Sequence, residues 1–557
     1  MDNSAIADNF SLLAKLMDIH GENSFKTKSY SSAAFAIEKL PAELSSIAED
    51  KIFSIKGIGE AIGKKIIEQL HTGELSLLNE YISKTPPGIL EMLAIKGIGP
   101  KKISVIWKEL EVESLGELLY ACNENRLLLY KGFGEKTQQN IKEAIEFYLS
   151  NQGSYLFAQL EKFALDADSK IKAAFPSYLF EPAGDFRRHI ETIDKLEWVT
   201  TTTQKEITEF FIQQEYEIIT EEDTHTQVKG KENLLLIFYH STKEKFYKTL
   251  FEKSCSPEFL VAWQNQFSFE NNYASEEEIF KHAGVDFIPP YLRETDKIIL
   301  QAANHSLPTV IQTSDITSII HSHSKWSDGN NTIEEMATAA IQKGFQYLVL
   351  SDHSKTAFYA QGLYEDKIIA QHKEIDELNK KLFPFKIFKS IESDILNDGN
   401  LDYTNEVLST FDLVIASVHS NLKMKEEKAM MRLLNAIENP FTSILGHPTG
   451  RLLLSRNGYP IDHKKIVDAC AANNVVIELN SHPKRLDFDW RWIDYCLEKN
   501  VLISIDPDAH STEGYNDIRY GVLAAQKAGV TKEHNLSSFS LPAFEAFIKQ
   551  QHQKRPL

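Results

Sequence analysis

Apolar and polar positions follow two different rhythms in the C-terminal part of this 557-residue chain. Short apolar runs alternate there with segments whose apolar residues recur every three or four positions. The apolar runs are residues 315–320, 347–351, 385–390, 413–418, 442–445, 475–479 and 501–505, and the helical segments are residues 332–343, 368–381, 425–437, 464–473 and 491–499. Strands that alternate with helices at this spacing predict a parallel β/α barrel.

Histidines and acids stand at the ends of these predicted strands. His321 and His323 come first, and side chains two residues apart on a strand point to the same face. Asp328 follows in a turn, from which a short carboxylate can reach back to the pair. Similar positions after the later runs are held by His353, Glu392, His419, His447, Asp508 and His510. Imidazole and carboxylate groups bind zinc, manganese or iron, so the sequence predicts a site for several metal ions at the barrel's C-terminal end.

These motifs resemble the PHP domain (polymerase and histidinol phosphatase) in the form carried by bacterial family X DNA polymerases. The resemblance covers roughly residues 315–557. It implies a distorted seven-stranded barrel that hydrolyses phosphoesters with divalent ions, Mn²⁺ or Zn²⁺ and also Fe²⁺. It implies three ions, held by His321, His323, Glu392 and Asp508, by Glu392, His419 and His447, and by Asp328, His353 and His510. Glu392 would be shared between two ions, so it is expected to be catalytic, and its loss is expected to cost more activity than the loss of one outer histidine.

Arginines near these motifs are candidates to bind a substrate phosphate, because a guanidinium group matches phosphate oxygens bidentately. Arg451 is preferred to Arg485, which could instead pair structurally with Asp487. Lys325 and Trp326, in the first metal loop, could contact or stack on a terminal base, and packing of the loop is the alternative for Trp326.

A degenerate repeat marks the N-terminal 150 residues. The pattern apolar-x-Gly-apolar-Gly precedes each of the predicted helices 60–70, 100–110 and 135–148. Its glycine pairs are Gly57 and Gly59, Gly97 and Gly99, and Gly132 and Gly134. The glycines allow a tight turn and expose the amides at the next helix N-terminus, which attract phosphate. Each copy resembles a helix-hairpin-helix motif, which binds the DNA backbone without reading its sequence. Lysines in the helices that follow, among them Lys65 and Lys101, strengthen the prediction of duplex or gapped DNA as partner.

The first copy is also similar to the small N-terminal domain of family X polymerases. In relatives that remove deoxyribose phosphate, a lysine of the second hairpin helix forms a Schiff base, and Lys65 stands at the matching position. Such chemistry needs an amine of lowered pKa. An exposed helical lysine is the competing interpretation.

Residues 175–188 resemble the strand-turn-helix entry of a nucleotidyltransferase palm. Relatives carry Gly-Ser, then Arg-Arg, then two aspartates one residue apart. Gly184, Arg187 and Arg188 match, but Asp185 replaces the serine and the aspartate positions hold Lys195 and Glu197. Two-metal phosphoryl transfer needs clustered carboxylates, and a lysine among them disfavours metal binding. The third family carboxylate is expected in residues 233–240, which contain no acid. DNA synthesis is therefore expected to be lost.

The expected organisation is multidomain. It comprises a polymerase-X-like helix-hairpin-helix domain (residues 1–82), a tandem helix-hairpin-helix region (83–150), a degenerate α+β palm and thumb (151–310) and a distorted (βα)7 PHP barrel (315–557).

Composition narrows the class of protein without changing this organisation. A net charge of −19 argues against a generally basic nucleic-acid binder but leaves room for binding through amides and metal ions. The four cysteines are scattered, which predicts a reducing compartment and no cysteine zinc site. No segment approaches a membrane span, so the cytoplasm is the expected location. The protein is expected to be a monomer.

The function predicted from these features is a metal-dependent DNA phosphodiesterase of DNA repair. It is a 3′–5′ exonuclease that could also act at abasic sites or 3′-phosphates, on gapped or nicked DNA or 3′ ends. The alternatives are a PHP phosphatase acting on small phosphate monoesters, a polymerase that still fills gaps with altered metal ligands, and a non-catalytic DNA-binding scaffold.

Overall fold

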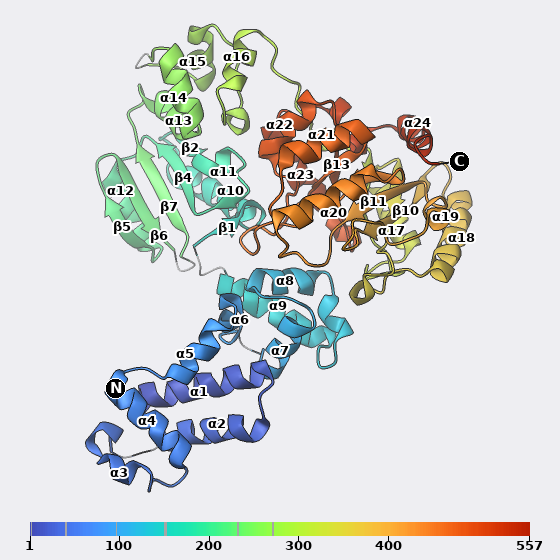
Figure 1. Ribbon diagram of the computed structural model, residues 1–557. Helices are drawn as coiled ribbons and strands as arrows, with labels where there is room; N and C mark the ends of the chain where they lie inside the picture. Colours follow the sequence, from blue (N-terminus) through green and yellow to red (C-terminus); the bar gives the residue numbers. More distant parts are fainter. Residues whose placement is uncertain are drawn as a thin grey trace. The chain divides into compact units, whose positions relative to one another are not determined.

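The chain forms two compact units, Met1–Leu149 and Ser150–Leu557 (Figure 1). The computed structural model describes residues 1, 3–38, 40, 42–95, 97–149, 153–230, 233–269 and 272–556. Among them, no helix has the length and apolar character that crossing a bilayer requires.

The first unit is helical. Its helices are α1 Asn3–His20, α2 Ser24–Glu38, α3 Glu49–Ile52, α4 Glu60–Thr72, α5 Ser76–Ser83, α6 Pro87–Met92, α7 Pro100–Lys108, α8 Leu115–Asn123 and α9 Glu135–Leu149. One apolar core runs through the unit from Ile6 on α1 to Ile145 on α9. The Ser104 hydroxyl on α7 donates to the carbonyl of Ile19 on α1, at 2.9 Å. The two domains expected at residues 1–82 and 83–150 thus share a continuous core, and the boundary between them stays a prediction.

The second unit begins with a mixed sheet. Its strands are β2 Phe180–Ala183, β4 Lys195–Thr200, β5 Glu217–Glu221, β6 His225–Lys229 and β7 Leu235–His240, in the order β2-β4-β7-β6-β5. Only β4 and β7 pair in parallel within this described sheet. A small pair joins β1 Tyr155–Leu156 to β3 Thr192–Ile193. Helices α10 Phe157–Ala174, α11 Gly184–Arg187 and α12 Gln204–Gln213 accompany the strands. This α+β layout is the one expected for a palm, and we call residues 153–240 the palm-like module.

A second small core follows the palm-like module. It is built by α13 Phe246–Lys253, α14 Pro257–Gln266, α15 Glu276–Ala283 and α16 Lys297–Ala303. Aromatic rings fill it, with Phe251 and Trp263 at 5.1 Å between centroids. We call residues 246–303 the thumb-like part.

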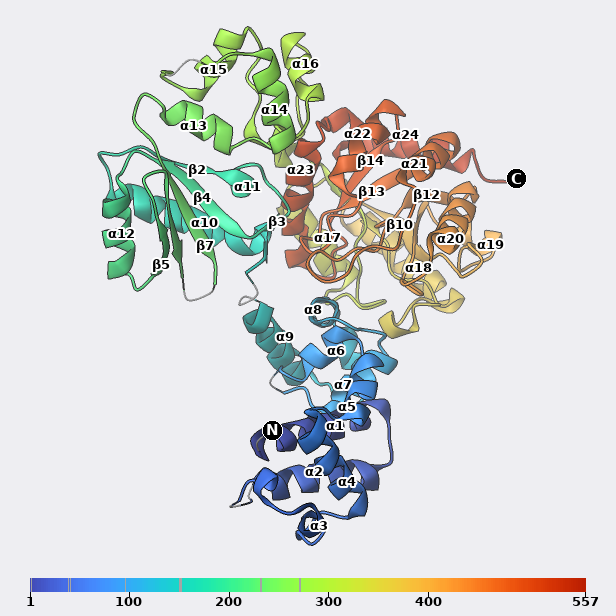
Figure 2. The same cartoon turned by 60° about the vertical axis from the view of Figure 1, so that its left-hand side comes forward.

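The remainder folds into the predicted β/α barrel, seen from two sides in Figures 1 and 2. Within the described chain, its parallel strands follow one another in sequence order: β8 Ser318–Ile319, β9 Tyr347–Leu350, β10 Lys386–Asp394, β11 Leu413–Ser417, β12 Thr442–Leu445, β13 Val476–Asn480 and β14 Ile503–Asp506. A parallel bridge between Ser322 and Ala509 brings the two edges together. The sheet is therefore nearly closed, and the expected distorted seven-stranded barrel is confirmed.

Helices cover the outside of the barrel and close its base. They are α17 Ile333–Gln342, α18 Glu365–Lys381, α19 Asn405–Leu408, α20 Glu426–Glu438, α21 His463–Asn473, α22 Trp490–Glu498, α23 Ile518–Lys527 and α24 Leu541–His552. Alternate residues of each strand face the two layers, because the side-chain period of a strand is two. Phe388 and Ile415 pack inside the barrel with Phe544 of α24, whereas Ile387 and Val414 pack against the outer helices.

Candidate metal centre

All nine side chains predicted as metal ligands lie at the C-terminal end of the barrel and contact one another there. Glu392 is on the inner face of β10, two positions beyond Ser390 and four beyond Phe388, so its carboxylate points into the barrel. It is 1% exposed and lies at the centre of the cluster. Its Oε1 is 2.9 Å from His447 Nε2, 3.1 Å from His419 Nε2 and 3.3 Å from His321 Nε2, and its Oε2 is 2.9 Å from His353 Nδ1.

The side chains of His321 and His447 reach the site through a change of backbone conformation. Ile320 packs inside the barrel, so simple alternation would turn the next residue outward. His321 instead has φ +60°, and the φ of +23° at His447 does the same after Gly446. Non-glycine residues rarely adopt positive φ, and where they do the surrounding structure holds them there. His321 and His323 lie in one group of ligand atoms, but beyond the strand, because β8 ends at Ile319.

Three overlapping groups of ligand atoms could each hold an ion. Within each, the ligand atoms lie within 4.8 Å of one another. The groups are His321, His323 and Asp508; His323, Asp328, His353 and His510; and His353, Glu392 and His419. His323 Nε2 is 3.0 Å from Asp508 Oδ1, and His510 Nε2 is 3.4 Å from Asp328 Oδ1. The grouping differs from the predicted one, because His323 and His353 each lie in two groups and His447 reaches the cluster through Glu392.

Carboxylates behind the ligands hold the imidazoles in place. Glu478 Oε1 lies 2.5 Å from His321 Nδ1, and Glu478 Oε2 accepts a hydrogen bond from the backbone N–H of His447 at 2.5 Å. Asp394 Oδ1 is 2.8 Å from His419 Nδ1. Such partners orient metal-binding imidazoles and raise their basicity. Sequence reasoning missed Glu478, although an acid inside the apolar run of residues 475–479 was the available signal.

Asp352 supports the first metal loop in a similar way. Its carboxylate accepts hydrogen bonds from the Ser324 N–H at 2.8 Å, from the Ser327 hydroxyl at 2.5 Å and from the Gln371 amide at 2.6 Å. It lies next to His353 in the chain, and it fixes the turn that brings Asp328 towards His353.

Electrostatics divide the imidazoles of the cluster into two kinds. Burial alone would lower the pKa of His419, but Glu392 and Asp394 raise it to about 10. Burial, followed by His510 and His353, lowers the pKa of His323 to about 3, and burial followed by Arg485 lowers that of His447 to about 4. Burial would raise the pKa of Glu392, yet the surrounding histidines hold it well below its usual range. The anionic centre and the neutral imidazoles suit a cation, and binding would release the remaining protons.

An unsatisfied buried atom also fits a metal ion. His321 Nε2 lies 3.3 Å from Glu392 Oε1 and 3.4 Å from Asp508 Oδ1, yet forms no aligned hydrogen bond with them or with any other described residue. A buried nitrogen facing two carboxylates would be satisfied by a shared cation, because buried polar groups otherwise find partners. The cluster is therefore compatible with divalent metal binding.

Arg451, the predicted phosphate ligand, is bound elsewhere. Its NH1 is 2.5 Å from Asp489 Oδ2, its Nε donates to the carbonyl of Arg485 at 3.1 Å and its NH2 donates to the carbonyl of Leu486. This bonding gives Arg451 a structural role and does not support the expectation of a phosphate clamp. Arg485 is the guanidinium beside the cluster, with its Nε 3.8 Å from Asp508 Oδ2. The Trp326 indole packs against the barrel core and donates to Glu374 at 2.9 Å, as its packing alternative required.

The three hairpins of the first unit share one backbone geometry. Gly57, Gly97 and Gly132 have φ of +92°, +93° and +98°, which only glycine adopts readily. Gly59 and Gly99 are the N-cap residues of α4 and α7, and Gly134 directly precedes α9. A Cβ on any of these second glycines would meet no atom within 4 Å, so the fold itself does not require glycine there. Open space at a helix N-terminus leaves room for a phosphate to approach the amides.

Lysines of the hairpin helices differ in their surroundings. Lys64 Nζ pairs with Glu60 at 2.7 Å, and Lys65 lies half-buried on the same helix, α4. Lys101 is exposed on the first turn of α7. A hollow of about 690 Å³ opens beside the first hairpin and is lined by Lys26, Lys28 and Gly59 among others. The lyase role of Lys65 stays a prediction.

The charged residues of the degenerate polymerase site pair with one another. Lys195 Nζ is 3.0 Å from Glu197 Oε1, which also accepts a hydrogen bond from the Tyr239 hydroxyl at 2.7 Å. Asp185 pairs with Arg188 at 2.6 Å. Gly184 lies against the Glu197 carboxylate, because a Cβ at residue 184 would fall 1.8 Å from Glu197 Oε2.

The two arginines of that site bind the thumb-like part. Arg187 makes a bidentate pair with Glu276, at 2.9 and 3.1 Å, and Arg188 NH1 is 2.9 Å from Glu294. Opposite Glu197 on β7 stands Ile237. No second carboxylate faces Glu197 from β7, and both arginines are engaged within the described structure.

Comparison with known proteins agrees with this anatomy. Residues 1–75 match the model of a helix-hairpin-helix domain, residues 89–146 that of a SAM-like helix-hairpin-helix tandem and residues 320–482 that of the PHP domain. The chain is 32% identical over 560 residues to the DNA polymerase/3′-5′ exonuclease PolX of Bacillus subtilis (strain 168), covering 97% of this chain and 98% of that protein. The chain belongs to the PolX family. The family models that match this PolX chain cover its helix-hairpin-helix and PHP regions.

Proteins that align with the barrel but not with the rest of the chain are named as probable phosphatases. A probable phosphatase of Thermoanaerobacter sp. (strain X514) is 27% identical over 234 residues, which cover 40% of this chain and 90% of that protein. A probable phosphatase of Acetivibrio thermocellus is 30% identical over 156 residues, 27% of this chain and 59% of that protein. The PolX barrel thus shares its scaffold with proteins named as phosphatases.

Proposed function

We propose that this PolX-family chain is a metal-dependent DNA phosphodiesterase that removes nucleotides from 3′ ends, a 3′–5′ exonuclease of DNA repair. The observation that carries the proposal is the buried cluster of six imidazoles and three carboxylates centred on Glu392. The Bacillus subtilis relative, named as a 3′-5′ exonuclease, supports it over nearly the whole chain.

Three divalent ions, Mn²⁺ or Zn²⁺ and also Fe²⁺, would be held by the nine predicted ligands. Bound ions would supply Lewis acidity that activates water and neutralises charge on the scissile phosphate. The protein's own part is to hold the imidazoles, through Glu478 and Asp394, and to exclude bulk water from the buried ligands. Arg485, 6% exposed and beside Asp508, is our candidate for binding a substrate phosphate in place of Arg451.

Lysines in the loops that follow the candidate ligands favour a polyanionic substrate. Although the chain carries a net charge of −19, Lys325, Lys423 and Lys425 are exposed in these loops. The hairpins would add sequence-independent contacts to the DNA backbone. We propose gapped or nicked DNA and 3′ ends as substrates, with abasic sites and 3′-phosphates as further ones, acted on by a cytoplasmic monomer.

DNA synthesis is proposed to be lost. Glu197 is paired with Lys195 instead of with a second carboxylate, and Arg187 and Arg188 are held by Glu276 and Glu294. The palm-like module and thumb-like part would then serve as scaffold. The expected division at residues 151–310 and 315–557 is retained in this proposal.

A phosphatase acting on small phosphate monoesters is the second candidate, because the probable phosphatase of Thermoanaerobacter aligns over most of its own length. The two candidates differ in substrate. Purified protein with Mn²⁺ should shorten a 3′-labelled or 5′-labelled oligonucleotide from its 3′ end much faster than it hydrolyses p-nitrophenyl phosphate or histidinol phosphate. Turnover of the monoesters alone would overturn the exonuclease proposal.

Removal of the central ligand tests where the activity resides. Glu392→Ala should lower exonuclease activity by at least ~100-fold and reduce bound metal, and should cost more than His510→Ala, because Glu392 contacts four imidazoles. Metal content and single-turnover rates measure both effects. Primer extension in a His321→Ala background, free of degradation, should give no product.

A further inference from the structure

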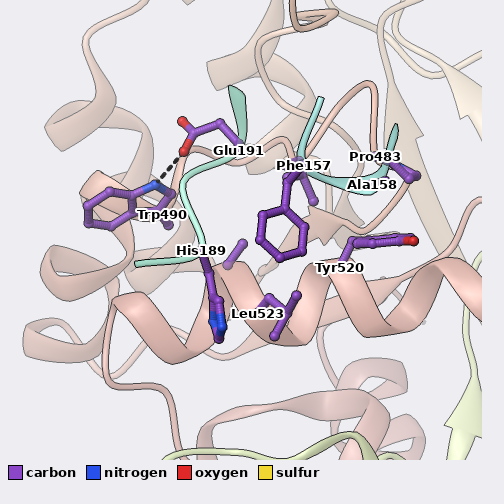
Figure 3. Close-up of a pocket in the computed structure, with 10 residues that line it drawn as sticks. Phe157, Ala158, His189, Glu191, Pro483, Trp490, Tyr520 and Leu523 are labelled. Carbon is purple, nitrogen blue, oxygen red and sulfur yellow. Dashed lines mark hydrogen bonds between the residues drawn. The ribbon is translucent and has the colours of Figure 1, made fainter. Parts of the chain in front are cut away.

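The palm-like module is packed against the barrel in the second unit, and this contact leads towards the metal centre. Figure 3 shows Phe157, His189 and Glu191 of the palm-like module against Trp490, Tyr520 and Leu523 of the barrel helices. The hollow between them has about 20 Å³, enough for roughly one water molecule. The two surfaces are therefore in close contact.

Glu191 is the acidic residue of this contact. It is 7% exposed, its Oε2 accepts a hydrogen bond from the Trp490 indole at 3.1 Å, and its Oε1 is 2.6 Å from Arg491 NH1 (Figure 3 shows the first). Both partners open α22, whose N-cap residue is Asp489. Glu191 thus binds the start of a barrel helix from outside the barrel.

The contact continues through Asp489. Arg491 NH1 is 3.0 Å from Asp489 Oδ1 and 3.2 Å from Oδ2, and Arg451 NH1 is 2.5 Å from the same Oδ2. One carboxylate is therefore shared by two guanidinium groups. Arg451 in turn donates to the carbonyls of Arg485 and Leu486.

The segment held by Arg451 borders the metal centre on two sides. Arg485 Nε lies 3.8 Å from Asp508 Oδ2. Asp487 Oδ2 accepts a hydrogen bond at 3.0 Å from the backbone N–H of Thr449, two residues after His447. A shift of residues 485–487 would move both the candidate phosphate ligand and the loop that carries His447.

We propose that Glu191 is a positioning residue for the exonuclease, acting through Arg491, Asp489 and Arg451 on the placement of Arg485. The inference rests on the proposed function of the barrel. Arg491 is 48% exposed, and without Glu191 its guanidinium would be free to take Asp489 from Arg451. The ion pair with Glu191 keeps Arg491 from displacing Arg451 at Asp489. Arg451 therefore stays bound to Asp489 and to the carbonyls of residues 485 and 486. The palm-like module, although it lacks the carboxylates expected of a polymerase, would then still contribute to the exonuclease activity of the barrel.

The test is Glu191→Gln in the full chain loaded with Mn²⁺, with an oligonucleotide as substrate. Gln keeps the shape and can accept the Trp490 hydrogen bond, but it loses the charge that holds Arg491. We expect KM to rise about tenfold and kcat to change less than about threefold, because Arg485 binds a phosphate present in the ground state as well as in the transition state. Asp489→Asn should have a similar effect, and the double variant should be no worse than either single one, because both act on one chain of contacts.

Glu161→Gln is the matched control. Glu161 pairs with Arg519 across the same contact between palm-like module and barrel, but neither residue touches Asp489 or Arg451. It should lower the melting temperature as much as Glu191→Gln does while leaving KM unchanged. Equal KM values for the two variants, additive effects of Glu191→Gln and Asp489→Asn, or loss of bound metal in Glu191→Gln would each overturn the inference. An inactive wild-type protein would instead overturn the proposed function.

Discussion

Single residues decide how the metal centre is assembled. His321 and His447 point into the barrel because their backbones have positive φ, and Glu478 binds both the His321 ring and the His447 amide. The wholly buried carboxylate of Glu478 therefore stabilises two unfavourable backbone positions at once, in the manner expected where structure over-determines strained residues.

Glu478→Gln should weaken metal binding without removing a ligand. The amide keeps one acceptor but cannot raise the basicity of His321 as a carboxylate does, so we expect a loss of about 10-fold to 100-fold in metal affinity and in activity at limiting metal. Metal titration followed by calorimetry measures it. Glu545→Gln, which alters an exposed pair with Lys386 on the opposite end of the barrel, is the control and should leave affinity unchanged. Equal affinities in the two variants would count against a supporting role for Glu478.

At the scale of elements, the two glycines of each hairpin differ in their role. The backbone conformation requires the first glycine, whereas the second leaves open space in which a ligand could bind. The first glycine of each pair has a positive φ, whereas a Cβ at the second would meet nothing within 4 Å. The repeat seen in the sequence predicts the hairpins well because turn chemistry is local.

Gly99→Ala should reduce DNA affinity without unfolding the unit. Its φ of −92° suits alanine, but the added methyl group would stand at the N-terminus of α7, where a phosphate would approach. We expect a loss of about threefold to tenfold in affinity for a gapped duplex, measured by fluorescence anisotropy at low salt.

Gly97→Ala is the counterpart of that variant. At φ +93° an alanine is strained, so the melting temperature should fall by the equivalent of about 1–2 kcal/mol. A Gly99→Ala protein that binds DNA as well as the wild type would remove the second hairpin from the DNA-binding surface.

The loop after β9 offers a second element-scale prediction. It is tied at its base, where the Leu363 N–H donates to the carbonyl of His353 at 2.8 Å, and it presents Phe358 with 75% of its surface exposed. An exposed ring in a loop that also carries Lys355 suits stacking on a base. Phe358→Ala should raise KM for an oligonucleotide about tenfold and leave hydrolysis of bis-p-nitrophenyl phosphate unchanged. Equal losses on both substrates would show that the ring serves the barrel's structure instead.

At the scale of the whole second unit, the contact between the palm-like module and the barrel contains a half-buried histidine. His189 stacks on Tyr291 at 5.4 Å between ring centroids. Burial, followed by Lys527 and Arg519, lowers its pKa to about 4. In the unfolded chain this imidazole takes a proton near pH 6.5, whereas in the folded unit it stays neutral until about pH 4. Acidification therefore favours unfolding, and the contribution is absent above pH 6.5.

His189→Gln should make stability less sensitive to acid. Between pH 7.5 and 5, the free energy of unfolding of the wild type should fall by roughly 2 kcal/mol more than that of the variant. Urea titrations at a series of pH values measure this difference. Parallel curves for the two proteins would show that His189 does not titrate with folding.

Particular residues show which features of the fold and of the candidate site could be predicted from the sequence. Periodicity and turn residues identified the strands, the helices and the hairpins. The spacing of His321, His353, His419, His447 and His510 after apolar runs identified histidines that gather at one end of the barrel, because both kinds of signal are local. The sequence predicted Arg451 as a phosphate ligand, whereas the structure pairs it with Asp489. Which partner a guanidinium finds here depends on a residue 38 positions away. Sequence reasoning missed Glu478, whose partners lie 157 and 31 positions away.

The sequence by itself determined that the chain contains hairpins, a degenerate palm and a barrel with ligands at one end, because each is encoded by neighbouring residues and by the period of a strand or helix. Only the tertiary structure decided which candidate ligands lie close enough to share an ion and which arginine stands beside Asp508. It alone also showed that Glu191 of the palm-like module binds Trp490 and Arg491 at the start of α22. Those outcomes depend on barrel closure and on packing between segments hundreds of residues apart, and no local pattern records them.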